Sequence, residues 1–458
     1  MKRVMEIVTG RREFLIFVAA MAFMNRFGIR TAGAESKKPQ ALVIGAGLAG
    51  LSAAQVLSTK GFSVTILEAR HRIGGRLFTD TSLGTPVELG ASFIHGFEDN
   101  PLSRLVGRLN VRTFETDSED VIVYDKKGNI VPEERLFELE DILEELRHDV
   151  DKAAENNESL QQAIKRVDAE FLNDPLNLWA LTSTVEFDTG GPIEDLSAEY
   201  FDEDAVFEGG DILLPDGLDA ILSNFINDIE FKTDVMVQDI KYNRDHGVEV
   251  STSQGIFRAD IAICTLPLGV LKNGDVSFDP PLPKKYRHAI DHIPMGNVTK
   301  LALQFDKPFW DVETEYFGAL TDQKGRWPLF MNYRTISNEN ILLGLCFGSY
   351  SSRIEASSDN QIQADMMDVL RDMFGDSVAG PVNYVMSRWS VDPFSKGAYS
   401  FTGINTRPSH FQILAKPIDN VLMLAGEHTH FLYHGTLHGA YISGQSAALK
   451  LFEIWDSD

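Results

Sequence analysis

The segment at residues 41–50, Ala-Leu-Val-Ile-Gly-Ala-Gly-Leu-Ala-Gly, constrains the fold more than any other part of the chain. Its apolar run predicts a buried strand, and its glycines predict a tight turn that leads into a helix. Gly45 permits the turn, Gly47 lets the backbone approach a pyrophosphate, and Gly50 lets the helix pack against the strand. Glu68 follows 18 residues after Gly50, where the ribose-binding acid of such a unit belongs. The spacing therefore predicts a strand–helix–strand unit that binds a dinucleotide, rather than a glycine-rich turn without a ligand.

The length and the charge of the chain limit the kinds of function it can have. With 458 residues it is long enough for two interleaved domains and a large core. It carries 67 acidic and 42 basic side chains, a net charge of −25. Nothing offsets the repulsion of phosphates, which argues against nucleic-acid binding. Such a field would concentrate small cations, although the acidic residues could equally serve only solubility.

The first 34 residues are predicted to be a targeting segment. Arg11 and Arg12 precede an apolar stretch at 15–24, and Ala-Gly-Ala at 32–34 offers a cleavage site. Ten apolar residues are too few to cross a membrane core of about 30 Å, so no stable span is expected. The paired arginines resemble a bacterial twin-arginine export signal, with an ordinary secretion signal or an uncleaved anchor as alternatives. We therefore expect contact with that export machinery and a periplasmic or secreted protein, whose net charge would change from −25 to −29 because six basic and two acidic residues leave.

The periodicity of apolar residues predicts the order of the other elements. It predicts, in chain order, exposed helices within 132–172, strands within 231–266, strands within 297–350, an amphipathic helix at 359–374, and a strand–turn–helix at 420–454. This order predicts an α/β protein whose cofactor domain is discontinuous. The cofactor domain would comprise 40–87, 205–290 and 388–458, and a substrate domain would comprise 88–204 and 291–387.

Two side-chain types that often bind metals receive other interpretations. Cys264 and Cys346 stand in apolar runs without a metal or redox spacing, so buried free thiols are expected, with a disulfide as the alternative. Four histidines gather near the C-terminus, but the glycine between them makes four convergent imidazoles improbable. They are His428, His430, His434 and His438. No metal is expected.

The C-terminal segments 424–429 and 435–444 complete a set of motifs through which the chain resembles the flavin-dependent amine oxidases. Within that superfamily it most resembles the polyamine oxidases and the flavin-dependent lysine demethylases. The motifs run in family order across nearly the whole chain. They comprise Gly45, Gly47, Gly50 and Glu68, and the segments 70–76, 88–96, 265–271, 295–300, 388–399 and 426–444.

The resemblance implies the two-domain flavin amine oxidase fold, with a Rossmann-like FAD-binding domain and a mixed-sheet and helical substrate domain. It implies noncovalent FAD, because Ala398 stands where monoamine oxidases carry the cysteine that bonds the flavin. Glu68 would bind the ribose, Arg70 and Arg76 would neutralise the pyrophosphate, and the backbone of Val237 would meet the adenine. The residues expected to contact FAD are Gly45, Ala46, Gly47, Leu48, Ala49, Gly50, Glu68, Arg70, Gly75, Arg76, Gly90, Ala91, Ser92, Val237, Trp389, Gly426, Glu427, Thr436 and Leu437.

The resemblance also assigns the catalytic positions. On spacing alone Lys300 would be a solvent-facing strand lysine, but it matches the family's lysine that holds a water at flavin N5. Tyr399 matches one wall of an aromatic sandwich, and Thr436 replaces the second wall, which favours a long, flexible amine. His95 would bond a substrate nitrogen or tune its protonation, with a structural role as the alternative.

Trp389 and Phe93 would line the same region or serve as core packing. The expected reaction is hydride transfer from an amine to flavin N5, followed by imine hydrolysis to an aldehyde and an amine, with O2 reoxidising the flavin to give H2O2. The favoured substrate is a cationic polyamine such as spermine or spermidine. A monoamine, an L-amino acid or an alkaloid, a peptide lysine, and a flavoprotein with a purely structural or binding role are the alternatives. An L-amino acid would need an arginine facing its carboxylate, and the sequence does not locate one.

Overall fold

A computed structural model describes residues 38–457, except residues 156, 228 and 377. The contacts divide the chain into two units, residues 1–38 and 39–458, and all that follows concerns the second unit. The expected export signal at 1–34 lies outside the described residues.

A six-stranded sheet forms the base of the dinucleotide unit. Its strands stand in the order β19 (Pro417–Ile418), β20 (Leu422–Leu424), β12 (Ile261–Cys264), β1 (Gln40–Ile44), β2 (Ser63–Leu67) and β8 (Glu230–Lys232). All neighbours pair in parallel except β19 with β20. Because parallel strands are buried on both faces, the continuous apolar runs of β1 and β12 fit central positions.

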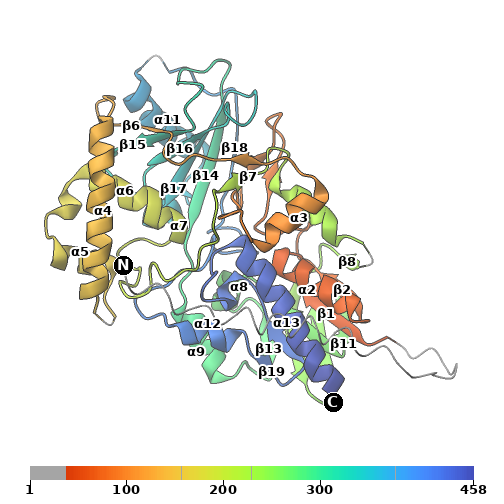
Figure 1. Cartoon of the computed structure of the whole chain (residues 1–458). Coiled ribbons are helices and arrows are strands. Elements are labelled where there is room, and N and C mark those ends of the chain that lie inside the picture. The colour runs from red at the N-terminus through yellow and green to blue at the C-terminus, as the bar shows by residue number, and fades with distance from the viewer. Residues whose placement is uncertain (1–37, 156, 228, 377, 458) are drawn as a thin grey trace. The chain divides into compact units, whose positions relative to one another are not determined.

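Helices α2 (Leu48–Thr59) and α13 (Leu437–Ser457) cover one face of this sheet. Helix α2 follows β1 and packs against the C-terminal helix α13. Figure 1 shows these two helices side by side although about 390 residues separate their starts. The other face packs against a sheet of order β11 (Gly255–Ala259), β10 (Gly247–Thr252), β9 (Val237–Asn243) and β13 (Ser277–Asp279), and against α9 (Lys284–His292) and α12 (Pro408–Leu414). The carboxyl ends of β1, β2 and β12 therefore share one edge, where ligands bind in such sheets.

A second six-stranded sheet lies in the other part of the chain. Its order is β18 (Asn383–Met386), β14 (Val298–Gln304), β17 (Ile341–Phe347), β16 (Leu329–Asn332), β15 (Tyr316–Ala319) and β6 (Val121–Tyr124). Only β15 and β6 pair in parallel. Helices α4 (Glu133–Ala153) and α6 (Pro175–Leu181) pack on β6, and α11 (Asp359–Phe374) packs on the face that carries Leu301.

Short elements complete the description. They are β3 (Thr79–Asp80), β4 (Val87–Glu88), α3 (Pro101–Leu109), β5 (Phe114–Glu115), α5 (Leu160–Val167), α7 (Phe187–Thr189), β7 (Ile212–Leu213), α8 (Leu268–Asn273) and α10 (Gly348–Ile354).

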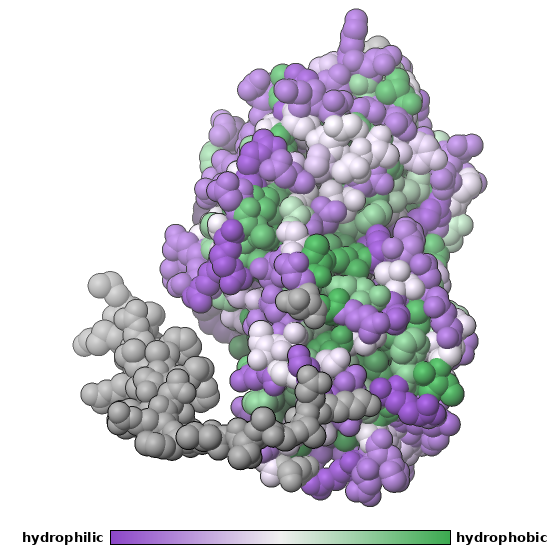
Figure 2. Space-filling model, turned by 90° about the vertical axis from the view of Figure 1, so that its right-hand side faces the viewer, coloured by the Kyte–Doolittle hydropathy of each residue, from purple (hydrophilic) through white to green (hydrophobic). Residues whose placement is uncertain are grey.

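The helix predicted at 359–374 has the bounds that the sequence indicated, and the acidic stretch 132–172 forms α4 and α5. The first sheet draws its strands from 40–87, 205–290 and 388–458, and the second from 88–204 and 291–387. The domain boundaries themselves stay a prediction. Within residues 38–457 no described helix has the length and apolar character needed to cross a membrane. The face in Figure 2 is mostly hydrophilic, with smaller patches of hydrophobic residues among the polar ones.

Candidate active site

A cavity of about 830 Å³ begins at the shared edge of β1, β2 and β12 and continues to β14 of the second sheet. This volume lies in the upper part of the range for ligand pockets. All the sequence-predicted site residues line the cavity except Ala46 and Gly50, and Phe93 lines it as well. Ala46 is fully buried behind the wall, and Gly50 packs on the turn. The structure therefore brings together side chains from four distant parts of the chain.

The glycine turn at 45–50 lets the start of α2 approach the end of β1 closely. Gly45 has φ +102°, which favours glycine, and its N–H donates to the carbonyl of Leu67 at 2.8 Å. A Cβ on Gly50 would lie 2.0 Å from the carbonyl oxygen of Gly45, so only glycine lets α2 start here. Gly47 precedes the first residue of α2. The N-terminus of α2 thereby faces the cavity, where a phosphate is stabilised by free N–H groups and the helix dipole.

Glu68 at the end of β2 is buried and held by backbone donors. One carboxylate oxygen accepts from the N–H of Ala46 at 2.7 Å, and the other accepts from the N–H of Arg70 at 2.8 Å. A carboxylate oxygen can accept more than one hydrogen bond, so both oxygens remain able to bind hydroxyl groups from the cavity. This is the chemistry that a ribose diol requires.

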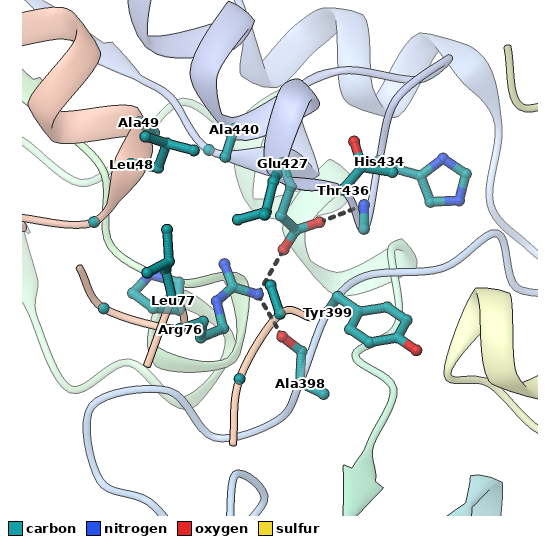
Figure 3. A pocket seen from close by; sticks show the side chains of 18 of the residues that line it. Leu48, Ala49, Arg76, Leu77, Ala398, Tyr399, Glu427, His434, Thr436 and Ala440 are labelled. Carbon is teal, nitrogen blue, oxygen red and sulfur yellow. Dashed lines mark hydrogen bonds and ion pairs between the residues drawn. The ribbon is translucent and has the colours of Figure 1, made fainter. Parts of the chain in front are cut away.

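Arg70 and Arg76 are each paired with an acid of the chain. Arg70 makes a two-pronged contact with Asp392 at 2.6 and 3.0 Å. Arg76 donates from Nη1 to the carboxylate of Glu427 at 2.9 Å and to the carbonyl of Ala398 at 2.7 Å (Figure 3). Their charges are therefore partly compensated within the protein, and the positive end of the cavity depends also on the helix N-termini.

Glu427 is the buried centre of a hydrogen-bond network. Its carboxylate accepts from Arg76, from the hydroxyl of Ser400 at 2.5 Å and from the N–H of Gly435 at 3.0 Å. Burial alone would raise the pKa of this carboxyl, but the charge of Arg76, the neighbouring His428 and the hydrogen bond from Ser400 lower the pKa to about 2. Figure 3 shows the side chain of Arg76 joined by dashed lines to Glu427 and to Ala398. The network joins three distant segments around the cavity.

The fit of this end to FAD follows from the chemistry of its donors. Two helices, α2 and α13, start at the cavity, and residues of both first turns line it. Gly75 has φ +61° and packs closely on Gly47. The cavity wall at this point therefore consists of backbone atoms without side chains. Glu68 offers acceptors for a ribose, and Val237 at the start of β9 also lines the cavity. The residues present can therefore hold a pyrophosphate and a ribose.

Lys300 in β14 is buried, so the solvent-facing interpretation of its spacing is wrong. Its Nζ donates to the carbonyl of Glu88 at 3.3 Å, the carbonyl of Gly90 at 2.6 Å and the hydroxyl of Ser92 at 2.5 Å. Burial lowers the pKa of Lys300, and the charge of Glu88 opposes that shift. Burial likewise raises the pKa of Glu88. The lysine is thus a fixed donor in the cavity wall, while its contact with a water stays a prediction.

Tyr399 is fixed at the opposite wall. Its hydroxyl donates to the carbonyl of Phe187 at 2.5 Å, and its ring packs on Gly190 and Gly435, where a Cβ would lie 2.7 and 3.2 Å from ring carbons. Both glycines have positive φ. The hydroxyl of Thr436 donates to the carbonyl of Tyr433 and accepts from the N–H of Gly439, so it caps α13. Thr436 is therefore a small cavity-lining side chain whose hydroxyl is bonded within the chain.

The same cavity contains a group of carboxylates that we call the acidic arm: Asp188, Asp202, Asp204 and Asp211. Burial, chiefly, raises the pKa of Asp188 to about 6, and the charges of Asp211 and Asp204 add to that rise while His95 and Arg147 oppose it. Within the described residues no hydrogen-bond partner occupies the Asp188 carboxylate. The arm is therefore suited to a cation.

His95 lies against this arm, with Nδ1 2.7 Å from the carboxylate of Asp211. Arg147 of α4 pairs with Asp202 at 3.2 Å, and His434 pairs with Asp204 at 2.9 Å. Of the cavity-lining arginines in the described chain, Arg70, Arg76 and Arg147, each is paired with an acid. None is left for a substrate carboxylate.

Trp389 is buried and donates from its indole N–H to the carbonyl of Leu89 at 2.8 Å, so its ring both lines the cavity and packs in the core. Cys264 and Cys346 are free and buried, which confirms the expectation of free thiols. Among the described residues no group of three or more histidine, cysteine or acidic side chains is placed to hold a metal. His434 and His438 line the cavity, whereas His428 is enclosed in the core.

Sequence reasoning did not find the acidic arm, Arg147 or the hydrogen bonds that Lys300 makes to the segment 88–92. Asp188 lies in the short helix α7 and Asp211 in an irregular segment, neither within a motif, and Asp211 is 116 residues from the histidine it contacts. The only signal was the general excess of acid. Position in space, rather than spacing in sequence, identifies these residues.

Comparison with known proteins gives a consistent result. A family model described as flavin containing amine oxidoreductase matches residues 48–451. Polyamine oxidase 2 of Arabidopsis thaliana is 32% identical over 451 residues, which cover 93% of this chain and 91% of that protein. Lysine-specific histone demethylase 1 homolog 2 of the same plant is 32% identical over 480 residues, but this chain spans only 63% of its length. A solved structure of putrescine oxidase with bound putrescine has a TM-score of 0.72, 21% identity and coverage of 90% and 98% of the two chains.

Proposed function

The chain belongs to the family of flavin-containing amine oxidoreductases and is an FAD-dependent amine oxidase, and from that premise we propose that its substrate is a polyamine such as spermine or spermidine. The observation that carries the proposal is that the acidic arm lines the same cavity as Lys300 and Tyr399. A polyamine carries several cationic nitrogens, so one nitrogen can react while another meets a carboxylate. The similarity to polyamine oxidases supports the same substrate class.

The arrangement of charge disfavours the other amines. An L-amino acid would bring a carboxylate toward Asp188 and Asp211, and Arg147, the arginine beside the arm, is already paired with Asp202. A monoamine has no second cationic nitrogen and would leave the carboxylate of Asp188 without a partner. The other three acids of the arm are paired with His95, Arg147 and His434, so a second cationic nitrogen gains most beside Asp188.

FAD, when bound, supplies at N5 a two-electron acceptor for a hydride from the carbon beside the substrate nitrogen, and O2 takes up those electrons to give H2O2. The imine product hydrolyses to an aldehyde and an amine. Tyr399 holds a rigid ring against which the alkyl chain lies, since its hydroxyl is bonded to Phe187 and its ring atoms pack on Gly190 and Gly435. The small Thr436 leaves room for a long, flexible chain. We propose that the ammonium group of Lys300, held by Gly90 and Ser92, lies near the reacting end and that its charge orients water or the leaving imine.

Anaerobic mixing of the purified holoenzyme with spermine, spermidine, butylamine or L-leucine tests the proposal. We expect spermine or spermidine to bleach the oxidised-flavin absorbance at least tenfold faster than butylamine, and L-leucine to leave it unchanged. Aerobic incubation with the same amines should release H2O2. If the flavin stays oxidised with both polyamines yet is reduced by butylamine, the substrate proposal is wrong although the chemistry is right.

We also propose that the protein is exported through the twin-arginine route. The support is the pair Arg11 and Arg12 before a short apolar stretch. That route carries folded proteins, which suits an enzyme that must bind its cofactor first. Replacing both arginines by lysine should leave active holoenzyme in the cytoplasm of the expressing bacterium; periplasmic holoenzyme in that variant would contradict the proposal.

A further inference from the structure

His95 forms a close pair with Asp211, one of the acids of the acidic arm. One oxygen of Asp211 lies 2.7 Å from Nδ1 of His95, and the other accepts from the N–H of Gly96 at 2.9 Å. The backbone of Asp211 is fixed in turn, because its carbonyl accepts from the N–H of Thr116 at 3.0 Å. The carboxylate is therefore held by the same loop that carries the histidine, and it orients the ring.

The partner of Nδ1 decides what the second ring nitrogen can do. An ionised carboxylate only accepts hydrogen bonds, so Nδ1 carries the hydrogen and Nε2 of the neutral ring keeps a lone pair. Among the described residues Nε2 of His95 has no hydrogen-bond partner, and the side chain is 42% exposed to the cavity. The ring thus presents a free acceptor in the cavity that also contains Lys300 and Tyr399.

We infer that Asp211 is a positioning residue that fixes His95 with Nε2 toward the substrate, where Nε2 takes a proton from the substrate's ammonium group. The N–H bond of the ammonium breaks, its electron pair stays on the nitrogen, and an Nε2–H bond forms. The resulting imidazolium is stabilised by the carboxylate of Asp211. The carbon beside a nitrogen gives up a hydride only when that nitrogen has a free electron pair, so this proton must leave first. The inference rests on the proposed oxidation of an amine.

The surrounding charges support this role. Burial would lower the pKa of His95, but the hydrogen bond and charge of Asp211, with the charge of Asp188, raise it above its usual value. His438 faces the pair from α13, and after burial the charge of His95 contributes to its lowered pKa. His438 is therefore the neutral neighbour, and His95 is the ring that can hold the proton. The acidic arm then retains the other cationic nitrogens of a polyamine.

The variant Asp211→Asn separates positioning from packing. Its amide oxygen can still accept from Gly96, but its NH2 group would donate to Nδ1 and move the hydrogen to Nε2. We expect kcat/KM for spermine to fall at least about 100-fold, as loss of a proton acceptor does. The acid limb of its pH profile, which in the parent lies above the ordinary histidine pKa, should move to lower pH. Asp216→Asn is the matched control, because Asp216 is exposed, pairs with Arg112 and does not line the cavity.

A second substrate gives a readout that a purely structural role would not change. With a spermine analogue fluorinated on the second carbon from the reacting nitrogen, whose amine is largely uncharged at the assay pH, the Asp211→Asn defect should shrink to a few-fold. An equal loss for both substrates would overturn the inference.

Nuclear magnetic resonance of ring-15N histidine in the full-length holoenzyme, assigned with His95→Gln, keeps this test separate from the proposed function. Hydrogen on Nδ1 in the parent and on Nε2 in the variant is expected. Hydrogen on Nε2 in the parent would refute the positioning role. If no amine reduces the flavin, the proposed function fails, and the ring resonances still decide how Asp211 orients His95.

Discussion

Replacing Arg76 by methionine tests how much the ion pair with Arg76 stabilises the buried carboxylate of Glu427. Arg76 contacts Glu427 at 2.9 Å and the carbonyl of Ala398 at 2.7 Å, and Glu427 is only 3% exposed. Methionine keeps most of the volume of the side chain but removes the charge and both hydrogen bonds. The variant therefore leaves a buried carboxylate whose remaining donors are Ser400 and Gly435.

The pKa of Glu427 gives the size of the effect. It is lowered from 4.5 to about 2, and that difference corresponds to about 3 kcal/mol of stability. Because the folded-state pKa is the lower one, this stabilisation is complete above about pH 4.5 and is lost as the pH falls toward 2. Removing one partner of a buried pair costs about 3–5 kcal/mol, since the other charge stays buried. We expect Arg76→Met to lose an amount in that range at pH 7.

Without Arg76, burial would raise the pKa of Glu427 above its ordinary value. The variant should then become more stable as the pH falls from 8 to 5, whereas the parent's Glu427 contribution is flat over that interval. Urea unfolding followed by circular dichroism, on the holoenzyme and on FAD-free protein, measures both effects. The double variant Arg76→Met/Glu427→Gln should recover much of the loss, because neither charge remains buried.

Arg112→Met serves as the control, since Arg112 forms an exposed pair and its loss should not change the unfolding midpoint. A free energy of unfolding for Arg76→Met within about 1 kcal/mol of the parent would refute the reasoning. So would a double variant no more stable than the single one.

Three further predictions concern the cavity. Lys300→Met should bind FAD normally but lose turnover about 100-fold, because a charged donor at the reacting end is removed; stopped-flow flavin spectra would show whether reduction or reoxidation slows, and unchanged turnover would make the lysine structural. Asp188→Asn should raise KM for spermine about tenfold and leave butylamine unaffected, as a panel of initial rates would show, unless the carboxylate does not meet the second cation. Gly50→Ala should purify with little FAD, judged by the 450 to 280 nm absorbance ratio, because its Cβ would lie 2.0 Å from a carbonyl oxygen, whereas Gly107→Ala, with open space around it, should retain FAD.

The sequence predicts those parts of the site whose residues lie close together in the chain and belong to one turn or one short unit of secondary structure. The glycine turn and Glu68 are of this kind, because the length of one helix sets their separation. Lys300 shows the limit: the alternation of β14 is compatible with a surface face, and only the loop at 88–92, folded over Nζ, makes that face internal. His95 and Asp211 are 116 residues apart in the sequence and meet only in the folded chain, so no local pattern predicts their contact. The resemblance to a family could supply Lys300, but not Asp211.

The distribution of charge in the cavity explains how an acidic protein binds an anionic cofactor and a cationic substrate side by side. Arg70 and Arg76 are already paired, so a pyrophosphate gains little from them as free charges and must depend largely on the backbone N–H groups at the starts of α2 and α13. Those partial charges act over about one helical turn. They therefore hold a phosphate without repelling a cation at the acidic arm, where the charge of Asp188 attracts it. Two unpaired arginines at the first end would instead oppose the entry of a polyamine, so the acids that neutralise them serve the substrate as well as the fold.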